Sequence, residues 1–313
     1  MRVEPTQPIT PSEVETAQNQ LLRAGFSLPR YGADGLFGRE TSAAVTRFQK
    51  ANGLAATGTL DLDTLQALAN ARSPFPDYAA IFSDGVLRAV LAVGYDEAGS
   101  HEPEQARVLT GLAERGYTPV TDDQRAALGL DAEGHYVTRR LEQGTVIIEL
   151  IFPDTGHAKT RFADALRRDE LVLYVGHGRY GSGPAFDDLR SPAGNFVIGQ
   201  PFEAGHVTLG PNDLGAAPLT SEYQLMFFDG CNTFRYFDDL RSRTPGKTTK
   251  NLDVIGSTTE LYWNVTAANL LTLLDGVTEQ RNLEELEASL DMVNRAGPAD
   301  QTRYFRGDGF EDN

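Results

Sequence analysis

The apolar stretch LVLYVGHG at residues 171–178 is followed later in the chain by QLMFFDGC at residues 224–231. Both have strand length, and their continuous apolar character is typical of strands that are buried on both faces of a parallel sheet. The first stretch carries His177 near its end and the second ends at Cys231, each beside a glycine. Because residues at the carboxyl ends of neighbouring parallel strands meet at one edge of a sheet, we expect the imidazole and the thiol to emerge together if the two strands are neighbours.

The sequence around this pair shows a regular alternation of two kinds of segment. From residue 81 onward, apolar runs of strand length alternate with helical patterns, which predicts an α/β domain with a mostly parallel sheet and helices on both faces. We place this domain at residues 81–296 and interpret residues 297–313 as a polar, poorly ordered tail. Between Arg179 and Tyr223 lies a long segment rich in glycine and proline, and loops of this kind are usually functional. The other strand-like runs are LRAVLAVGYD (87–96), GTVIIELIF (144–152) and LDVIGS (252–257), and the helical runs are PEQARVLTGLAERGY (103–117), AKTRFADALRR (158–168) and TAANLLTLLDGV (266–277).

Residues 1–72 show apolar positions at helical spacing in three segments, which predicts a small all-α module of three helices. Ser12 is the expected N-cap of the first helix, Thr41 that of the second, and Asp61 opens the third. The stretch NARSPFPDYA that follows contains two prolines, which disfavour helix continuation. We therefore assign residues 73–80 to a linker.

The composition excludes several classes of partner. The chain has 28 basic and 44 acidic residues, and its net charge of −16 repels nucleic acid and anionic lipid surfaces. Its apolar runs are too short to span a membrane and the start has no apolar leader, so we expect a cytoplasmic protein. One cysteine and five scattered histidines offer neither a disulfide framework nor zinc-ligand spacing, so we expect no metal and no cofactor.

The pairing of a histidine with a lone cysteine predicts nucleophilic catalysis. A free thiol with a pKa of about 8.5 is little ionised at neutral pH, so it needs a nearby imidazole that takes its proton. His177 can supply this base to Cys231. Gly178 and Gly230 stand beside the two residues, where backbone N–H groups can turn toward a developing oxyanion without interference from a Cβ atom.

The motifs YVGHG and FFDGC resemble the clan of cysteine peptidases that contains caspases, metacaspases, gingipains and separases. The resemblance implies a caspase-like sheet that hydrolyses protein or peptide substrates through a Cys/His dyad. In it, His177 is general base and acid, Cys231 is the nucleophile, and the backbone of Gly178 and Cys231 binds the oxyanion. The residues after the cysteine, Asn232 to Phe234, match neither caspases nor metacaspases, which leaves the subfamily open.

The resemblance also implies a preference for the substrate side chain. Asp229 stands two residues before the cysteine, where metacaspases have an acidic residue that lines the pocket for a basic side chain. We therefore expect cleavage after arginine or lysine, with Asp187 and Asp188 as alternative pocket residues. Some relatives are activated by calcium, for which Asp187, Asp188, Asp238 and Asp239 are candidate ligands.

The N-terminal module has a resemblance of its own. DGLFGRETSAAVTRFQKANGL (34–54) and TGTLDLDTLQAL (57–68) are similar to the peptidoglycan-binding module of many bacterial wall hydrolases. This implies peptidoglycan as a partner and a targeting or regulatory role, and it argues for export as the alternative to a cytoplasmic location. The alternative is a helical bundle that docks another protein.

Further interpretations concern the second domain. A caspase-like scaffold without activity is the main alternative to a peptidase. Gly176, Gly178 and Gly181 fit a G-x-G-x-x-G pattern for dinucleotide binding, but the prolines that follow are incompatible with a phosphate-binding helix. Trp263 is expected to cover the sheet or to wall the substrate cleft. The remaining histidines stand in polar or turn-rich stretches and are predicted to lie at the surface: His101, His135, His157 and His206.

Overall fold

The chain divides into two compact units, each described here by itself. A computed structural model describes residues 10–24, 26, 28, 30–70, 75–178, 183–187, 219–237, 240–244, 246–248, 250–297, 299–300, 302–308 and 310. Unit 1 comprises Met1–Phe75 with Asn282–Glu284, and unit 2 comprises Pro76–Arg281 with Glu285–Asn313.

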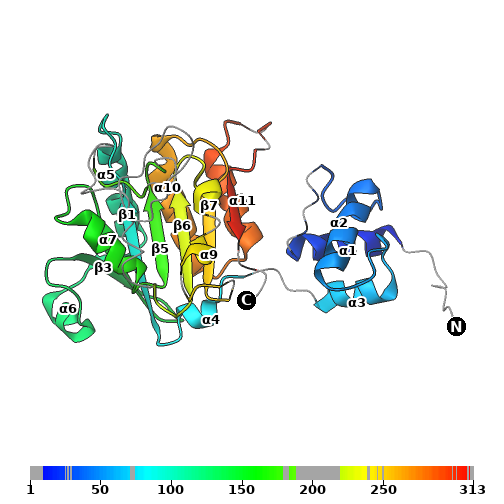
Figure 1. The fold of residues 1–313 in the computed structure, drawn as a ribbon, viewed down its shortest axis with the longest axis horizontal. Coiled ribbons are helices and arrows are strands. Elements are labelled where there is room, and N and C mark those ends of the chain that lie inside the picture. Colours follow the sequence, from blue (N-terminus) through cyan, green and yellow to red (C-terminus); the bar gives the residue numbers. More distant parts are fainter. Residues whose placement is uncertain are drawn as a thin grey trace. The chain divides into compact units, whose positions relative to one another are not determined.

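Unit 1 contains three helices: α1 (Pro11–Arg23), α2 (Arg39–Ala51) and α3 (Leu62–Asn70) (Figure 1). Their apolar faces pack into one core, in which the rings of Phe26 and Phe48 meet edge to face at 5.4 Å between centroids. The core residues are Ala17, Leu21, Leu28, Ala44, Val45, Phe48, Leu60 and Leu68. The predicted all-α module is confirmed.

The helix starts differ in part from those predicted. Thr10, not Ser12, caps α1, because the N–H of Glu13 donates to Thr10 Oγ1 at 3.3 Å and the N–H of Thr10 donates to Glu13 Oε2 at 2.7 Å. The prediction for α2 is also wrong, since its N-cap is Gly38 and Thr41 lies inside the helix. The prediction for Asp61 is correct: its Oδ1 accepts the N–H of Thr64 at 2.9 Å.

Two buried glutamines hold the connecting segments of this unit. Gln49 in α2 accepts the N–H of Gly58 at 2.8 Å and donates its amide to Thr64 Oγ1 at 2.8 Å. Gln18 in α1 accepts the N–H of Gly35 in the same way, also at 2.8 Å. Because each amide satisfies several buried polar groups at once, both glutamines are structural.

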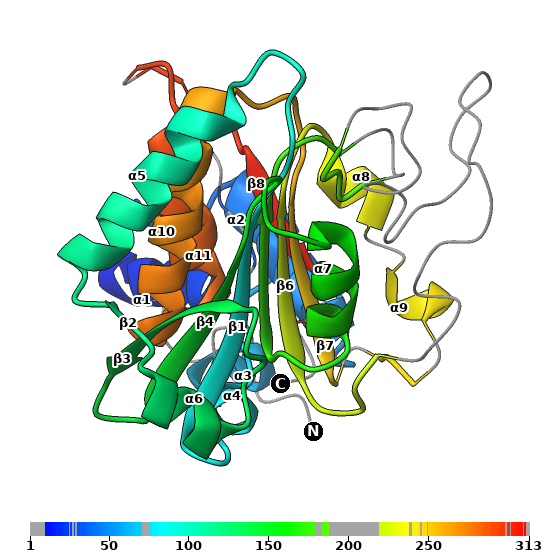
Figure 2. The ribbon, with the colours of Figure 1, turned by 90° about the vertical axis from the view of Figure 1, so that its left-hand side faces the viewer.

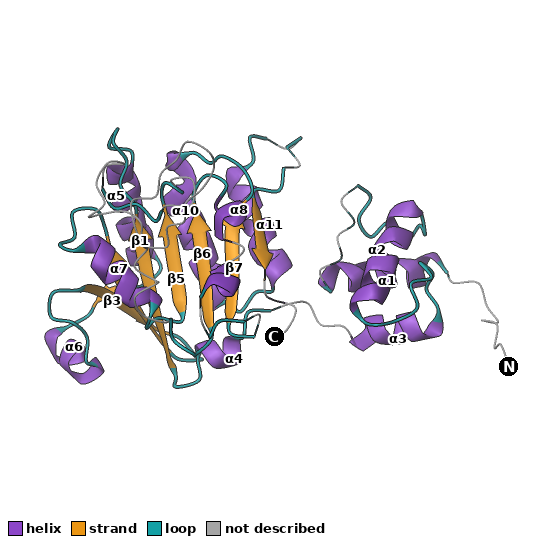
Figure 3. Cartoon of the chain, viewed as in Figure 1, coloured by secondary structure: helices purple, strands orange, loops and turns teal. Residues whose placement is uncertain are grey.

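Unit 2 is built on one sheet. Within the residues that the structure describes, its eight strands lie in the order β2-β3-β4-β1-β5-β6-β7-β8 (Figure 3). The five central strands from β4 to β7 are parallel. Toward the two edges, β3 pairs antiparallel with β4 and with β2, and β8 pairs antiparallel with β7. The bounds are β1 Val86–Val93, β2 Thr118–Pro119, β3 His135–Arg140, β4 Thr145–Ile151, β5 Leu171–Val175, β6 Gln224–Asp229, β7 Leu252–Ser257 and β8 Phe305–Asp308.

Helices cover both faces of the sheet. Figure 2 shows α5 (His101–Glu114), α10 (Thr266–Thr278) and α11 (Leu283–Asn294) on one face. On the other face lie α7 (Ala158–Leu166), α8 (Thr233–Phe237) and α9 (Leu240–Arg243). The other described helices of this unit are α4 (Tyr78–Ile81), α6 (Asp122–Leu128) and η3 (Trp263–Val265). This arrangement confirms the predicted fold class, a mostly parallel sheet with helices on both faces and a helical module before it.

Every residue of β5 and β6 is buried, as expected for central strands of a sheet covered on both sides. None of the described helices has the length and apolar character that would let it cross a membrane.

The structure differs from the sequence-based expectation at two places in unit 2. Residues 297–313 were expected to form a poorly ordered tail, yet β8 lies there and pairs with β7. Phe305 is 1% exposed and packs against Phe227, and Asp291 in α11 accepts the N–H of Phe305 at 3.1 Å. The predicted linker contains α4, which Asp77 caps through the N–H of Ala80.

The role of Gln49 predicts a measurable loss of stability. Replacing it with leucine keeps the volume but leaves the N–H of Gly58 and the hydroxyl of Thr64 without this partner. We expect Gln49→Leu to lower the free energy of unfolding of unit 1 by about 2–4 kcal/mol. Scanning calorimetry of the full chain should show one transition moved to lower temperature. Gln66→Leu, at an exposed position of α3, is the matched control and should leave both transitions in place; an equal shift in the two variants would contradict the assignment.

Candidate functional site

The turns that follow β5 and β6 lie against each other. The strands are parallel and pair Val175 with Asp229, so His177 and Cys231 stand at equivalent positions, two residues beyond that pair. The N–H of Gly176 donates to the backbone oxygen of Asp229 at 2.8 Å. The structure therefore brings the two predicted residues to the same edge of the sheet.

Glycine is required where these turns touch. A Cβ atom on Gly230 would lie 2.3 Å from the backbone oxygen of Gly176 and 3.1 Å from the nitrogen of Gly178. Gly176 itself has a φ of 149°, a conformation that residues with a side chain rarely adopt. The Gly-x-Gly and Gly-Cys pattern thus permits close backbone contact between the two turns.

The imidazole of His177 is held by groups from three parts of the chain. Its Nε2 atom lies 3.0 Å from Asp96 Oδ1 and 3.7 Å from Glu97 Oε2. The ring meets that of Trp263 edge to face at 5.5 Å, so this tryptophan is at the site. The hydroxyl of the fully buried Tyr174 donates to the backbone oxygen of His177 at 3.1 Å and fixes the turn. With Nε2 directed to Asp96, Nδ1 is the nitrogen left for another partner.

Asp96 is the site residue that sequence reasoning missed. It follows β1, the neighbour of β5, and is 8% exposed. Its Oδ2 accepts the N–H of Ser100 at 3.1 Å. Burial opposes ionisation of this carboxyl, but hydrogen bonds from Ser100 and the contact with His177 outweigh it, so the pKa of Asp96 lies below its ordinary value. The signal was in the sequence, because LRAVLAVGYD also ends in a polar residue at a strand end.

Cys231 is partly exposed at the start of a rigid turn. Its sulfur lies 3.9 Å from the backbone oxygen of Leu261, in the segment that also carries Trp263. Asn232 has a φ of 56°, which is uncommon for a residue other than glycine. The turn is anchored by Ser257 in β7, whose N–H donates to Thr233 Oγ1 at 3.0 Å and whose hydroxyl donates to the backbone oxygen of Gly230.

Two backbone N–H groups lie at this edge. Gly178 and Cys231 lie at the ends of the turns, and no hydrogen bond among the described residues uses either of their N–H groups. Both groups are thus open to an acceptor from outside the described part of the chain. They are the two groups that the sequence assigned to an oxyanion.

The predicted pocket residues have different environments. Asp229 is fully buried, Asn269 of α10 donates to its Oδ2 at 2.9 Å, and its Oδ1 has no hydrogen-bond partner in the described structure. Burial raises the pKa of Asp229 to about 7, although the hydrogen bond from Asn269 acts in the opposite direction. Asp187 is half-buried. Three of the other named carboxylates lie outside the described residues: Asp188, Asp238 and Asp239.

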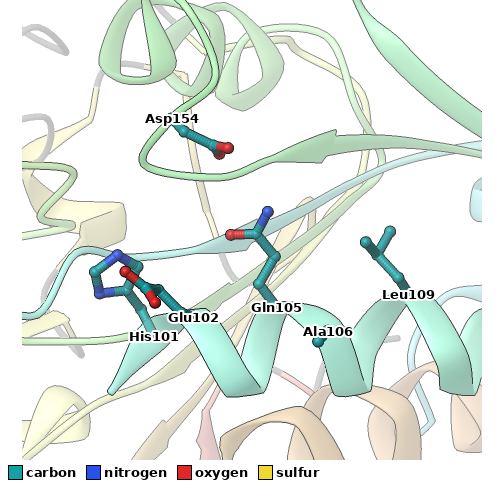
Figure 4. A pocket seen from close by; sticks show the side chains of 6 residues that line it. All are labelled: His101, Glu102, Gln105, Ala106, Leu109 and Asp154. Carbon is teal, nitrogen blue, oxygen red and sulfur yellow. The ribbon is translucent and has the colours of Figure 1, made fainter. Parts of the chain in front are cut away.

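A pocket lies at the start of α5, where His101 lines it (Figure 4). His101, predicted to lie at the surface, is 8% exposed, because its Nδ1 accepts the N–H of Asp96 at 3.0 Å and its ring packs on Tyr95. The pocket has a volume of about 340 Å³. It is lined by His101, Glu102, Gln105, Ala106, Leu109 and Asp154.

One group of side chains in the described structure could hold a metal ion. The ligand atoms of Asp96, Glu97 and His177 all lie within 4.8 Å of one another. The sequence predicted no metal site, because His177 lies far along the chain from the adjacent Asp96 and Glu97 and the three show no ligand spacing.

Comparison with known proteins bears on the N-terminal module. Residues 10–68 match the family model "Putative peptidoglycan binding domain". A "Probable N-acetylmuramoyl-L-alanine amidase" of Bacillus licheniformis is 47% identical over 62 residues, which are 20% of this chain and 18% of that protein. The "N-acetylmuramoyl-L-alanine amidase CwlL" of the same organism is 48% identical over 58 residues, 18% of this chain and 16% of that protein.

The chain thus spans less than a fifth of the length of these curated relatives. No solved structure matches the chain. The resemblance of the second domain to caspase-like peptidases has no support from these matches and stays a prediction. What the comparisons establish is that the segment from residue 10 to residue 68 is a peptidoglycan-binding-type module.

Proposed function

We propose that the protein is a cysteine endopeptidase whose nucleophile is Cys231, with His177 as its base and Asp96 as the residue that orients this base. The observation that carries the proposal is the 3.0 Å contact between Asp96 and His177. His177 follows β5, which lies next to β6, the strand that leads to Cys231. A carboxylate that fixes a histidine beside a nucleophile is the arrangement that hydrolases of several folds use.

The three side chains come from three adjacent parallel strands, β1, β5 and β6. With Nε2 directed to Asp96, Nδ1 of His177 takes the proton of the thiol as the sulfur attacks the scissile carbonyl carbon. The N–H groups of Gly178 and Cys231 bind the oxyanion, and His177 then returns the proton to the leaving amine. Water hydrolyses the thioester with the same base and releases the acid product.

Asp229 supports a preference for arginine or lysine before the scissile bond. Its Oδ1 is buried without a hydrogen-bond partner in the described structure, and such groups in native proteins usually have a functional reason. A guanidinium or ammonium group from the substrate would supply the missing donor and the opposite charge.

The N-terminal module supports a role at the bacterial wall. Two proteins that share this module are named for an amidase acting on N-acetylmuramoyl-L-alanine. We infer that the module of this chain binds peptidoglycan and holds the peptidase near wall-associated proteins or peptides. Because peptidoglycan lies outside the cytoplasm, this part of the proposal is incompatible with the cytoplasmic location expected from the sequence.

The catalytic assignment predicts the behaviour of three variants. Peptide reporters that end in arginine, lysine or aspartate should be cleaved by the wild type with preference for the basic two. Cys231→Ala should abolish hydrolysis, and Asp96→Asn should lower kcat by on the order of 10²- to 10⁴-fold, because His177 loses its orienting acceptor. The exposed Asp154→Asn is the control and should keep wild-type rates.

Because Cys231 is the sole cysteine, its alkylation by iodoacetamide is read directly from the mass of the chain. Equal hydrolysis by wild type and Cys231→Ala would contradict a cysteine peptidase. Absence of both hydrolysis and alkylation at neutral pH would favour the alternative, a scaffold without activity.

Asp229 predicts a dependence of stability on pH. Its pKa is about 7 in the folded chain and 3.8 without the fold, so the folded state loses stability as pH rises from about 4 to about 7. Asp229→Asn cannot ionise and should be more stable than wild type by at most about 4 kcal/mol at pH 8, but by only about 1.5 kcal/mol at pH 5. Urea unfolding at the two values measures both differences, and a gain that does not grow with pH would refute the buried carboxylate.

The module predicts binding to insoluble peptidoglycan. The full chain should sediment with purified peptidoglycan, and Gln49→Leu should stay in the supernatant above the melting temperature of its weakened module. Gln66→Leu should sediment like the wild type. If the wild type does not sediment, the module has a different partner, such as a docked protein.

A further inference from the structure

Two carboxylates lie beside His177, and the proposed peptidase mechanism uses only one of them. Asp96 alone orients the ring, whereas Glu97 Oε2 lies 3.7 Å from the same Nε2 atom. Each of the three residues offers one ligand atom, and these atoms converge to within 4.8 Å. One imidazole nitrogen and two carboxylate oxygens at such spacing can supply three of the four ligands of a tetrahedral metal site.

We propose that Asp96, Glu97 and His177 bind a divalent metal ion, of which Zn²⁺ is the expected one, and that the bound ion inhibits the peptidase. The regulatory half of this inference rests on the proposed function, whereas metal binding does not. An imidazole ligand favours Zn²⁺, Co²⁺, Ni²⁺ or Cu²⁺, while Ca²⁺ and Mg²⁺ prefer oxygen ligands alone. The site is therefore different in kind from the calcium site considered from the sequence.

The ligands are arranged before any ion arrives. Asp96 is held by the N–H of Ser100, while its own N–H is bound to His101. Tyr174 fixes the backbone of His177. Such supporting contacts orient metal ligands and raise affinity.

The site is also accessible to an ion. The side chains of Asp96, Glu97 and His177 are 11%, 39% and 31% exposed. Three protein ligands leave a fourth position for water, as in many zinc sites.

Occupation of this site is incompatible with the proposed catalysis. A neutral histidine that binds a metal through Nε2 carries its remaining proton on Nδ1. Nδ1 then has no lone pair with which to accept the proton of Cys231, so the thiol stays protonated and attack on the substrate stops. If His177 is protonated beforehand, binding of the ion releases that proton to solvent.

The single tryptophan of the chain gives a readout that needs no activity. Trp263 lies with its ring centroid 5.5 Å from that of His177, so a bound Co²⁺ should quench its fluorescence. After treatment with chelator, the wild type should show saturable quenching by Co²⁺, and Zn²⁺ should reverse it by competition. Glu97→Gln should weaken Co²⁺ binding about 10-fold or more, and His177→Ala should abolish it. Glu102→Gln, which alters an exposed carboxylate nearby, is the matched control and should bind like the wild type.

Cys231→Ala distinguishes this site from one in which the sulfur of Cys231 is itself a metal ligand. Retained Co²⁺ affinity in that variant supports the set of two carboxylates and one imidazole. Loss of affinity would mean that the sulfur is a ligand and would overturn the proposal, as would quenching that does not saturate below millimolar Co²⁺.

The regulatory half is tested on reporter hydrolysis. With each protein compared with its own rate in the absence of metal, Glu97→Gln should need about 10-fold more Zn²⁺ than the wild type for half inhibition. Equal inhibition of the two proteins would overturn the switch. If neither hydrolyses any reporter, the proposed function has failed, and the fluorescence titration still decides whether the metal site exists.

Discussion

The contact between the turns after β5 and β6 is the constraint on which the candidate site depends. Position 230 has no room for a Cβ atom, which would lie 2.3 Å from the backbone oxygen of Gly176. Because the two turns touch through their backbones, the residues that follow, His177 and Cys231, are bound to the same edge. Ser257 of β7 holds the second turn from the other side through Thr233. A shift of either strand by one residue would move the reactive side chain that follows that strand away from the other.

The fold was predictable where burial is complete and not where it is partial. Strands such as β5 and β6 are apolar throughout because both faces are covered, so sequence alone identifies them. Strand β3, second from one edge, is mostly half-exposed, and β8 lies in a polar segment in which Phe305 is the deeply buried residue. Their pairing comes from contacts with the neighbouring strand rather than from their own composition.

The same limit applies to the site. His177 and Cys231 were predictable, because each follows a fully apolar strand and is a reactive residue type beside a glycine. Asp96 follows a strand too, but an aspartate after a strand is also a common turn residue. Its role depends on β1 lying next to β5, which is a matter of strand order. His101 was misplaced for a related reason, since only the fold brings its ring under the backbone of Asp96.

Charge is what distinguishes this site from a plain histidine–cysteine pair. One carboxylate is enough to fix the orientation of the base, and Asp96 fills that role at 3.0 Å. A second carboxylate at 3.7 Å places two negative charges around one ring nitrogen, in a chain that is already strongly acidic. Two carboxylates this close to one ring nitrogen repel each other, and a cation that contacts both lowers this repulsion. An imidazolium supplies a single positive charge, whereas a divalent ion compensates both carboxylates, and this difference favours Asp96, Glu97 and His177 as a site for a metal as well as a proton.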